Sequence, residues 1–227
     1  MIKNIFLDAG GVILNEEKYE KACAEIITGI IKLYNKNYSP DDYWKDAEEA
    51  VQRFVPGVSD YILYKHIKNI DEFEIKKKLY KNEIKKTQID QLQLSDGLDR
   101  FLIEFSKNFK IGILGQYGKD FKKFLSEQNL LHYFSFTEIQ DDYKITKPDP
   151  RYFKAVLRNC NCVPVESVMI GDRVDKDIIP AKMIGMKTIR IRTGLHKNQE
   201  PRSPAELPDL TVNSLSEISV DAVRAMG

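Results

Sequence analysis

The fold is decided by the stretch NIFLDAGGVIL, residues 4–14. Its first apolar run ends on the carboxylate of Asp8, and Gly10 and Gly11 precede a second apolar run. In an α/β sheet the ligand crevice lies at the carboxyl ends of the strands, so we expect Asp8 to point into one. The two glycines would let the backbone approach a ligand closely. A plain strand followed by a glycine turn explains this stretch equally well, so the choice depends on the rest of the chain.

The composition is that of an ordinary soluble globular protein. Of the 227 residues, 42% are apolar and 30% are charged, enough for one or two domains. The 35 basic and 34 acidic residues leave a net charge of +1, so no global field attracts nucleic acid or a membrane surface, and a small-molecule partner is favoured. The oligomeric state stays open. Lys3, Asn4 and Asp8 interrupt the first apolar stretch, which argues against a signal peptide and for a cytoplasmic location.

Residues 15–87 are predicted to form an all-helical insert. Apolar residues recur at helical spacing from Tyr19 to Tyr34, which predicts a long amphipathic helix. Ser39 followed by Pro40 is typical of a helix start. Two further helices follow, each with apolar residues on one side.

Helices and strands alternate after residue 94. Ser95 and Asp96 are typical of a helix N-cap. Strands are predicted at residues 109–114, 134–139, 167–170, 187–191 and 210–212, with helices between them that include residues 150–159, and a last helix from Ser214 onward. This alternation implies parallel strands joined by right-handed helical crossovers. The predicted fold class is therefore α/β, a doubly wound parallel sheet with an inserted α-helical region.

A second buried strand ends on an acid in the stretch VMIGDRVDKD, residues 168–177. Asp172 follows this strand directly and should share a crevice with Asp8. Two such carboxylates repel each other unless a cation lies between them, and their oxygen atoms suit Mg²⁺. Acids at the start of a helix also complement the helix dipole, an alternative that partly explains Asp177. With Asp8 as a partner, a Mg²⁺ site is the favoured interpretation.

The stretch KITKPDP, residues 144–150, fixes Lys147 before a rigid turn that leads into a helix. By itself such a stretch is typical of a surface turn. Beside two acids at strand ends, a rigidly held lysine is instead expected to bind an anion.

These residues resemble the haloacid dehalogenase (HAD) superfamily. Its four motifs fall at Asp8, at residues 114–116, at Lys147 and at residues 171–177, so the resemblance spans the whole chain.

The resemblance implies a two-domain organisation. Residues 1–14 and 88–227 would form a Rossmannoid core, and residues 15–87 would form an inserted helical cap. Because most members are Mg²⁺-dependent phosphatases, it also implies a hydrolase acting on small phosphorylated metabolites.

The same resemblance implies roles for single residues. Asp8 would be the nucleophile that forms an aspartyl-phosphate, and Lys147 would hold the phosphoryl oxygens. Gly115, Gln116 and Lys147 would contact the substrate. The implied Mg²⁺ ligands are Asp8, the carbonyl oxygen of Gly10 and Asp172, with Asp177 as an acid outside the ligand set.

Two positions depart from the phosphatase pattern. Gly10 stands where that pattern has a second aspartate serving as general acid and base, and Gly115 stands where it has serine or threonine. Loss of a general acid typically lowers a rate by about 10² to 10⁴-fold, so weak activity is expected. Substrates with good leaving groups should be least affected, and Asp141 and Asp142 are the candidates for replacing the acid.

Two alternatives remain open. The 2-haloacid dehalogenases also lack the second aspartate and attack carbon without a metal, but their fourth motif does not normally contain Gly-Asp, which favours the phosphatase. A weakly active, phosphate-binding pseudoenzyme is supported by Gly10 and Gly115. Retention of Asp8, Lys147 and Asp172 argues against it.

Overall fold

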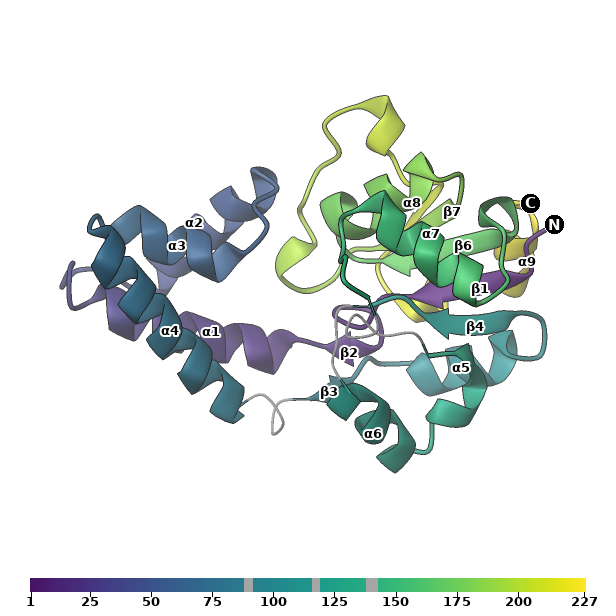
Figure 1. The fold of residues 1–227 in the computed structure, drawn as a ribbon, viewed down its shortest axis with the longest axis horizontal. Coiled ribbons are helices and arrows are strands. Elements are labelled where there is room, and N and C mark those ends of the chain that lie inside the picture. The colour runs from purple at the N-terminus through teal and green to yellow at the C-terminus, as the bar shows by residue number, and fades with distance from the viewer. Residues whose placement is uncertain (88–91, 116–118, 138–142) are drawn as a thin grey trace. The chain divides into compact units, whose positions relative to one another are not determined.

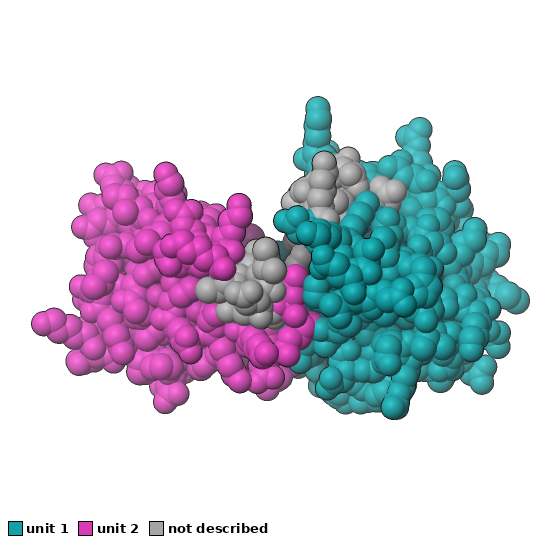
Figure 2. Space-filling model, turned by 90° about the horizontal axis from the view of Figure 1, so that it is seen from below, with its two compact units in different colours: residues 1–15, 94–193, 200–227 teal, residues 16–93, 194–199 magenta. Residues whose placement is uncertain are grey.

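The structure is a computed structural model that describes residues 1–87, 92–115, 119–137 and 143–227. The chain divides into two compact units, which Figure 2 colours separately. Unit 1 consists of Met1–Asn15, Leu94–Thr193 and Glu200–Gly227, and unit 2 of Glu16–Gln93 and Gly194–Gln199. Among the described residues, none of the helices has both the length and the apolar character needed to span a membrane.

Unit 1 contains a parallel sheet, as the sequence predicts (Figure 1). In the described residues its strand order is β5-β4-β1-β6-β7-β8, and the neighbouring strands pair in parallel. The strands are β1 (Asn4–Leu7), β4 (Lys110–Ile113), β5 (Phe134–Phe136), β6 (Ser167–Gly171), β7 (Lys187–Ile191) and β8 (Leu210–Val212). The chain runs outward from β1 through β4 on one side and from β6 through β7 on the other, so the order reverses between β1 and β6. Ligand crevices of doubly wound sheets form at such a reversal.

Helices on the sheet bury both faces of β1. Ile5, Phe6 and Leu7 are all fully buried, the pattern of a central parallel strand. The apolar side chains of α7 (Pro150–Asn159) join Phe6 and Met169 in one cluster, together with Ala181 of α8 (Ile179–Met183). The remaining helices of unit 1 are α5 (Leu98–Phe105), α6 (Lys119–Glu127) and α9 (Val220–Arg224). The predicted α/β fold class is confirmed.

Two predicted helix starts in unit 1 are wrong. α5 begins at Leu98, and its N-cap position is Gly97, whose φ of 77° is left-handed. Ser95 lies two residues earlier, where its backbone N–H donates to Ile13 O at 2.9 Å. The last helix begins at Val220 because the side chain of Ser219 accepts from the backbone N–H of Ala222. The end of the predicted strand 134–139 lies outside the described residues.

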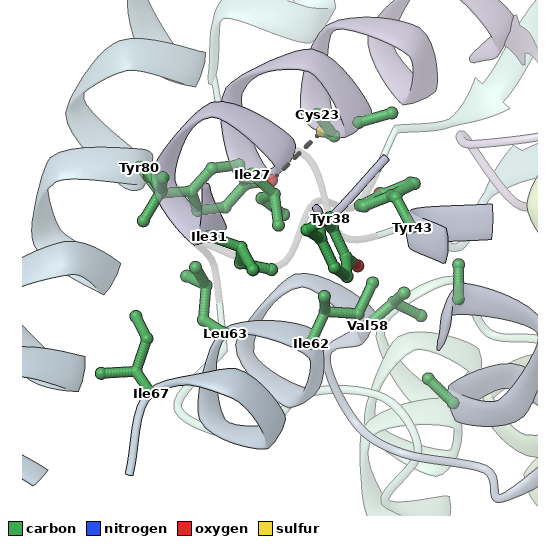
Figure 3. Packing of buried hydrophobic residues seen from close by; sticks show 14 of the residues in the cluster. Cys23, Ile27, Ile31, Tyr38, Tyr43, Val58, Ile62, Leu63, Ile67 and Tyr80 are labelled. Atoms are coloured by element: carbon green, nitrogen blue, oxygen red, sulfur yellow. Dashed lines mark hydrogen bonds between the residues drawn. The ribbon is translucent and has the colours of Figure 1, made fainter. Parts of the chain in front are cut away.

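Unit 2 is built from four helices in its described residues, namely α1 (Glu17–Ile31), α2 (Pro40–Gln52), α3 (Val58–His66) and α4 (Ile70–Thr87). Ser39 forms the predicted cap of α2, since its Oγ accepts from the Asp42 backbone N–H and the Asp42 carboxylate accepts from the Ser39 backbone N–H. Figure 3 shows Ile27 and Leu63 in the apolar core, where the Tyr80 hydroxyl donates to Cys23 Sγ at 3.1 Å. This core gives unit 2 its own source of stability.

Unit 2 also contains Gly194–Gln199, which follows β7 in the chain. The Leu195 backbone N–H donates to Glu20 Oε1 at 2.7 Å, and the fully buried Gln199 donates through Nε2 to Val51 O at 3.3 Å. The chain therefore passes between the units after Asn15, before Leu94, and again on both sides of this segment. The short strands β2 (Leu14–Asn15) and β3 (Gln93–Leu94) pair in a separate two-stranded sheet at the first two passages.

Candidate active site

Asp8 lies at the carboxyl end of the central strand β1. Its backbone N–H donates to Ile170 O of β6 at 2.9 Å, which continues the β1–β6 ladder one residue beyond β1. Its carboxylate side chain is 14% exposed, so it is accessible but largely desolvated. This is the placement that the sequence predicts for a reactive acid at a strand end.

Lys147 connects two acids of the site. Its Nζ lies 2.7 Å from Asp8 Oδ1 and 2.6 Å from Asp177 Oδ1, and its side chain is only 2% exposed. Burial lowers the pKa of Lys147, but the negative charges of Asp177 and Asp8 outweigh burial, and the pKa lies above its ordinary value. Lys147 is therefore a fixed cation beside Asp8. Asp149, which accepts from the Arg151 backbone N–H, caps α7 and so anchors the loop that carries the lysine.

Asp177 is a buried acid held by hydrogen bonds to both oxygens. Oδ1 accepts from Lys147, and Oδ2 accepts from the backbone N–H of Arg173 at 3.0 Å. Burial and the charge of Asp8 raise its pKa to about 6, against the opposing effect of Lys147. A π-helical turn, Val174–Ile178, carries the residue, and any side chain at Gly171 would overlap Asp177. Glycine is thus required before Asp172.

Asp172 lies directly after β6 and is buried. The backbone at Gly11 passes against it: a Cβ added to Gly11 would lie 2.8 Å from Asp172 Cγ, and the Gly11 φ of 68° also favours glycine. The turn that follows Asp8 therefore reaches Asp172, and glycine at position 11 permits this close approach.

Asp8, Asp172 and Asp177 form a group that could hold a cation. One carboxylate oxygen from each lies within 4.8 Å of the others. Carboxylate oxygens are the ligands of hard divalent cations, so these residues fit Mg²⁺. Both carboxylate oxygens of Asp177 already accept hydrogen bonds. This is compatible with the predicted role of Asp177 as an acid outside the set of direct Mg²⁺ ligands.

The predicted substrate-contact residues are only partly described. Gly115 lies beside Asp8, since a Cβ added there would be 3.4 Å from Asp8 Oδ1 and only 2.8 Å from the Ala9 Cβ. Gly10 bridges to Leu14 in the turn after Asp8. Gln116 lies outside the described residues, as do Asp141 and Asp142. The roles of all these residues remain predictions.

Sequence reasoning missed two groups near the acids. The Tyr152 hydroxyl donates to Gly115 O at 3.2 Å and so holds the backbone next to Asp8. Arg173 forms a two-point ion pair with Asp175, with contacts of 3.0 and 2.7 Å. Arg173 and Asp175 stand inside the quoted stretch 168–177, but nothing in their spacing distinguishes such a pair from solvated charges.

The fold and the site together define a class, a doubly wound α/β protein with carboxylates and a buried lysine at the strand ends. Residues 12–191 match the family of haloacid dehalogenase-like hydrolases, and the chain belongs to this family.

Curated relatives of this chain include phosphatases. A glyceraldehyde 3-phosphate phosphatase of Methanopyrus kandleri is 35% identical over 120 residues, 52% of this chain and 51% of that protein. A phosphoserine phosphatase of Thermus thermophilus is 36% identical over 89 residues, 39% of this chain and 34% of that protein. The chain thus covers about half of the first relative and about a third of the second.

Solved structures share the fold. The magnesium-bound HAD-hydrolase YfnB of Bacillus subtilis is similar with a TM-score of 0.63 and 17% identity, over 95% of this chain and 96% of that one. A 2-haloacid dehalogenase of Pseudomonas syringae is similar with a TM-score of 0.60 and 20% identity, over 99% of both chains. Phosphatase and dehalogenase chemistry therefore cannot be separated by fold.

Proposed function

We propose that the protein is a Mg²⁺-dependent phosphatase that acts on small phosphorylated metabolites through an aspartyl-phosphate on Asp8. The observation that carries the proposal is the buried Lys147 ammonium, which lies 2.7 Å from Asp8 beside a group of three carboxylates. A phosphoryl group needs both a nucleophile and cations that balance its charge. The phosphatase relatives support the same reaction class.

In the first half-reaction an Asp8 carboxylate oxygen attacks phosphorus. The bond from phosphorus to the ester oxygen breaks, and its electron pair goes to that oxygen, which then takes a proton from solvent water. Lys147, already fixed by Asp177, holds a phosphoryl oxygen and keeps Asp8 oriented. Mg²⁺ bound by Asp8, the Gly10 carbonyl and Asp172 would neutralise phosphoryl charge.

In the second half-reaction water attacks the phosphorus of the aspartyl-phosphate, and the Asp8 carboxylate leaves. Gly10 offers no side chain to protonate the leaving oxygen or to take the proton of that water. We therefore expect both half-reactions to be slow for substrates whose leaving group is poor. For acyl or glycosyl phosphates the first half-reaction should be nearly normal, so that the aspartyl-phosphate accumulates before water releases it.

The proposal keeps the division into a core of residues 1–14 and 88–227 and a cap of residues 15–87, with specificity assigned to the cap. A cytoplasmic location also remains part of it.

Two other functions are kept as alternatives. A 2-haloacid dehalogenase releases halide, which needs no proton, so Gly10 would suit that reaction. The three clustered acids favour a metal-dependent reaction instead. A phosphate-binding pseudoenzyme would keep Asp8 and Lys147 for binding alone.

A hydrolysis screen over phosphate esters, with and without Mg²⁺, tests the proposal beside a halide-release assay with 2-chloropropionate. We expect Mg²⁺-dependent phosphate release that Asp8→Asn abolishes, and a phosphoryl analogue trapped on Asp8. Halide release without metal would establish the dehalogenase. Phosphate binding with no hydrolysis of any ester would establish the pseudoenzyme.

A further inference from the structure

Arg190 is a buried cation that the proposed reaction does not use. It lies on β7 and is only 1% exposed, the largest of the fully buried side chains among the described residues. Buried arginines normally have hydrogen-bond partners, because an unpaired charge is costly to remove from water. The burial of Arg190 therefore calls for a specific role.

The position of Arg190 relates it to Asp172. In the β6–β7 pairing Arg190 lies opposite Gly171, the residue before Asp172. Its Nε donates to Asp172 O at 3.4 Å. Asp172 is thus held on two sides, by the Gly11 backbone against its carboxylate and by Arg190 at its main-chain carbonyl.

The charges near Arg190 act on it in both directions. Burial and the nearby Arg192 lower the pKa of Arg190, and Glu200 and Asp172 only partly oppose them. A guanidinium stays protonated in proteins even so. A positive charge near a cation site repels the cation, so a benefit to that site must come from geometry.

We propose that Arg190 is a positioning residue for the cation site, holding the main chain of Asp172 so that its carboxylate is oriented toward an ion shared with Asp8. The inference rests on the proposed function only in requiring that a divalent cation binds to these acids. Residues that orient metal ligands typically change metal affinity by about 10 to 100-fold when they are replaced.

A positioning role and electrostatic repulsion predict opposite changes in Mg²⁺ affinity when Arg190 is replaced. If Arg190 acts only through its charge, its removal strengthens Mg²⁺ binding. If it positions Asp172, its removal weakens binding. Arg192 is the matched control, because it carries the same charge two residues further along, is 45% exposed and pairs with Glu200 at 3.6 Å.

The experiment is calorimetric titration of the purified full chain with Mg²⁺, without substrate, on wild type, Arg190→Met, Arg190→Lys and Arg192→Met. Circular dichroism and denaturation in EDTA establish that each variant is folded. We expect the Kd for Mg²⁺ to rise by about 10-fold or more in Arg190→Met. In Arg190→Lys, which keeps a charged hydrogen-bond donor group, we expect a rise of several-fold. Arg192→Met should stay within about two-fold of wild type, as expected for an exposed charge.

Unchanged or tighter Mg²⁺ binding by Arg190→Met would overturn the proposal, as would wild type that binds no Mg²⁺. If Arg190→Met does not fold, Arg190→Lys decides, and a wild-type Kd in that variant overturns it. A wild type that binds Mg²⁺ but hydrolyses no phosphate ester refutes the proposed function and leaves the positioning role in place.

Discussion

Lys147 and Asp177 depend on each other inside unit 1. Both are buried, and their 2.6 Å contact places the lysine charge directly beside the Asp177 carboxylate. Removing one member of a buried ion pair leaves the other uncompensated and typically destabilises a protein by about 3–5 kcal/mol. The lysine is therefore expected to support the fold as well as the reaction.

Lys147→Met is expected to lower the free energy of unfolding by about 3–5 kcal/mol and to abolish phosphate release. Denaturant unfolding measures the first effect. Lys144→Met, an exposed lysine of the same loop, is the control and should stay close to wild type. A Lys147→Met variant as stable as the control would contradict the assigned ion pair, and Lys147→Met with Asp177→Leu should recover part of the loss.

Gly115 does more than lack the hydroxyl group of the serine or threonine expected there. The neighbouring Ala9 leaves no room for a side chain at this position. A Cβ there would lie 2.8 Å from the Ala9 Cβ and 3.0 Å from the Ala9 backbone nitrogen. Gly115→Ser should therefore destabilise the protein by about 1–3 kcal/mol through overpacking, without raising activity. Gly115→Ser combined with Ala9→Gly should recover stability. Equal unfolding free energies for the single and double variants would disprove this close contact.

Gly10→Asp tests whether the missing acid limits the rate. The new carboxyl group should protonate the leaving oxygen, which an alkyl phosphate needs more than an aryl phosphate does. We expect kcat/KM for an alkyl phosphate to rise by up to about 10²-fold, and by less for phenyl phosphate. Equal gains for the two substrates, or none, would mean that Gly10 is not simply a missing acid.

The helices of unit 2 are joined by an ionic cluster between α2 and α3. Asp46 accepts from Lys65 at 2.6 Å, from Tyr38 at 2.9 Å, and lies 2.6 Å from His66 Nε2. Burial raises the pKa of Asp46, but these hydrogen bonds outweigh it and the pKa lies below its ordinary value. Hydrogen bonding to Lys65 lowers the pKa of Glu49 to about 2.

Unit 2 should therefore lose stability in acid. A carboxylate whose pKa is lower in the folded state stabilises it above the unfolded pKa and loses that effect as pH falls through the folded pKa. We expect the loss between about pH 5 and pH 2, from the ordinary carboxyl range down to the folded Glu49 value. Fluorescence of Trp44, the single tryptophan, which lies on α2, reports it during denaturation.

The Asp46→Asn variant is expected to lose part of this pH dependence, whereas Glu48→Gln on the same helix should keep it. A wild-type denaturation midpoint that stays constant from pH 5 to pH 2 would contradict the role of the cluster.

At the scale of the whole molecule, each compact unit has an apolar cluster, and the group of three acids found in the described part of the chain lies in unit 1. A cation that binds the folded state stabilises it by mass action, by about 2.7 kcal/mol at a concentration 100-fold above Kd. Mg²⁺ should therefore slow amide hydrogen exchange in β1 and β6 more than in α1 to α3. Asp172→Asn should remove the effect. Equal slowing of amide exchange in both units would contradict this prediction, because it would mean that the two units unfold together.

The sequence by itself determined the features that depend on neighbours along the chain. The strand ends at Asp8 and Asp172, the cap of α2 at Ser39 and the bounds of α7 follow from hydrophobic periodicity and capping signals within a few residues. The α/β class follows from the alternation of these elements. Which acids carry out chemistry was inferred from residue type and position, and that part remains a prediction.

Only the tertiary structure decided what depends on residues far apart in the chain. Gly97 rather than Ser95 holds the N-cap position of α5, while the Ser95 backbone N–H donates to Ile13 O, and Gly194–Gln199 joins unit 2 through Glu20 and Val51. Lys147, in the loop before α7, meets Asp177 in the turn Val174–Ile178, and Arg190 of β7 meets Asp172, which follows the neighbouring strand β6. Local spacing carries no information on such pairs, because packing between elements determines them.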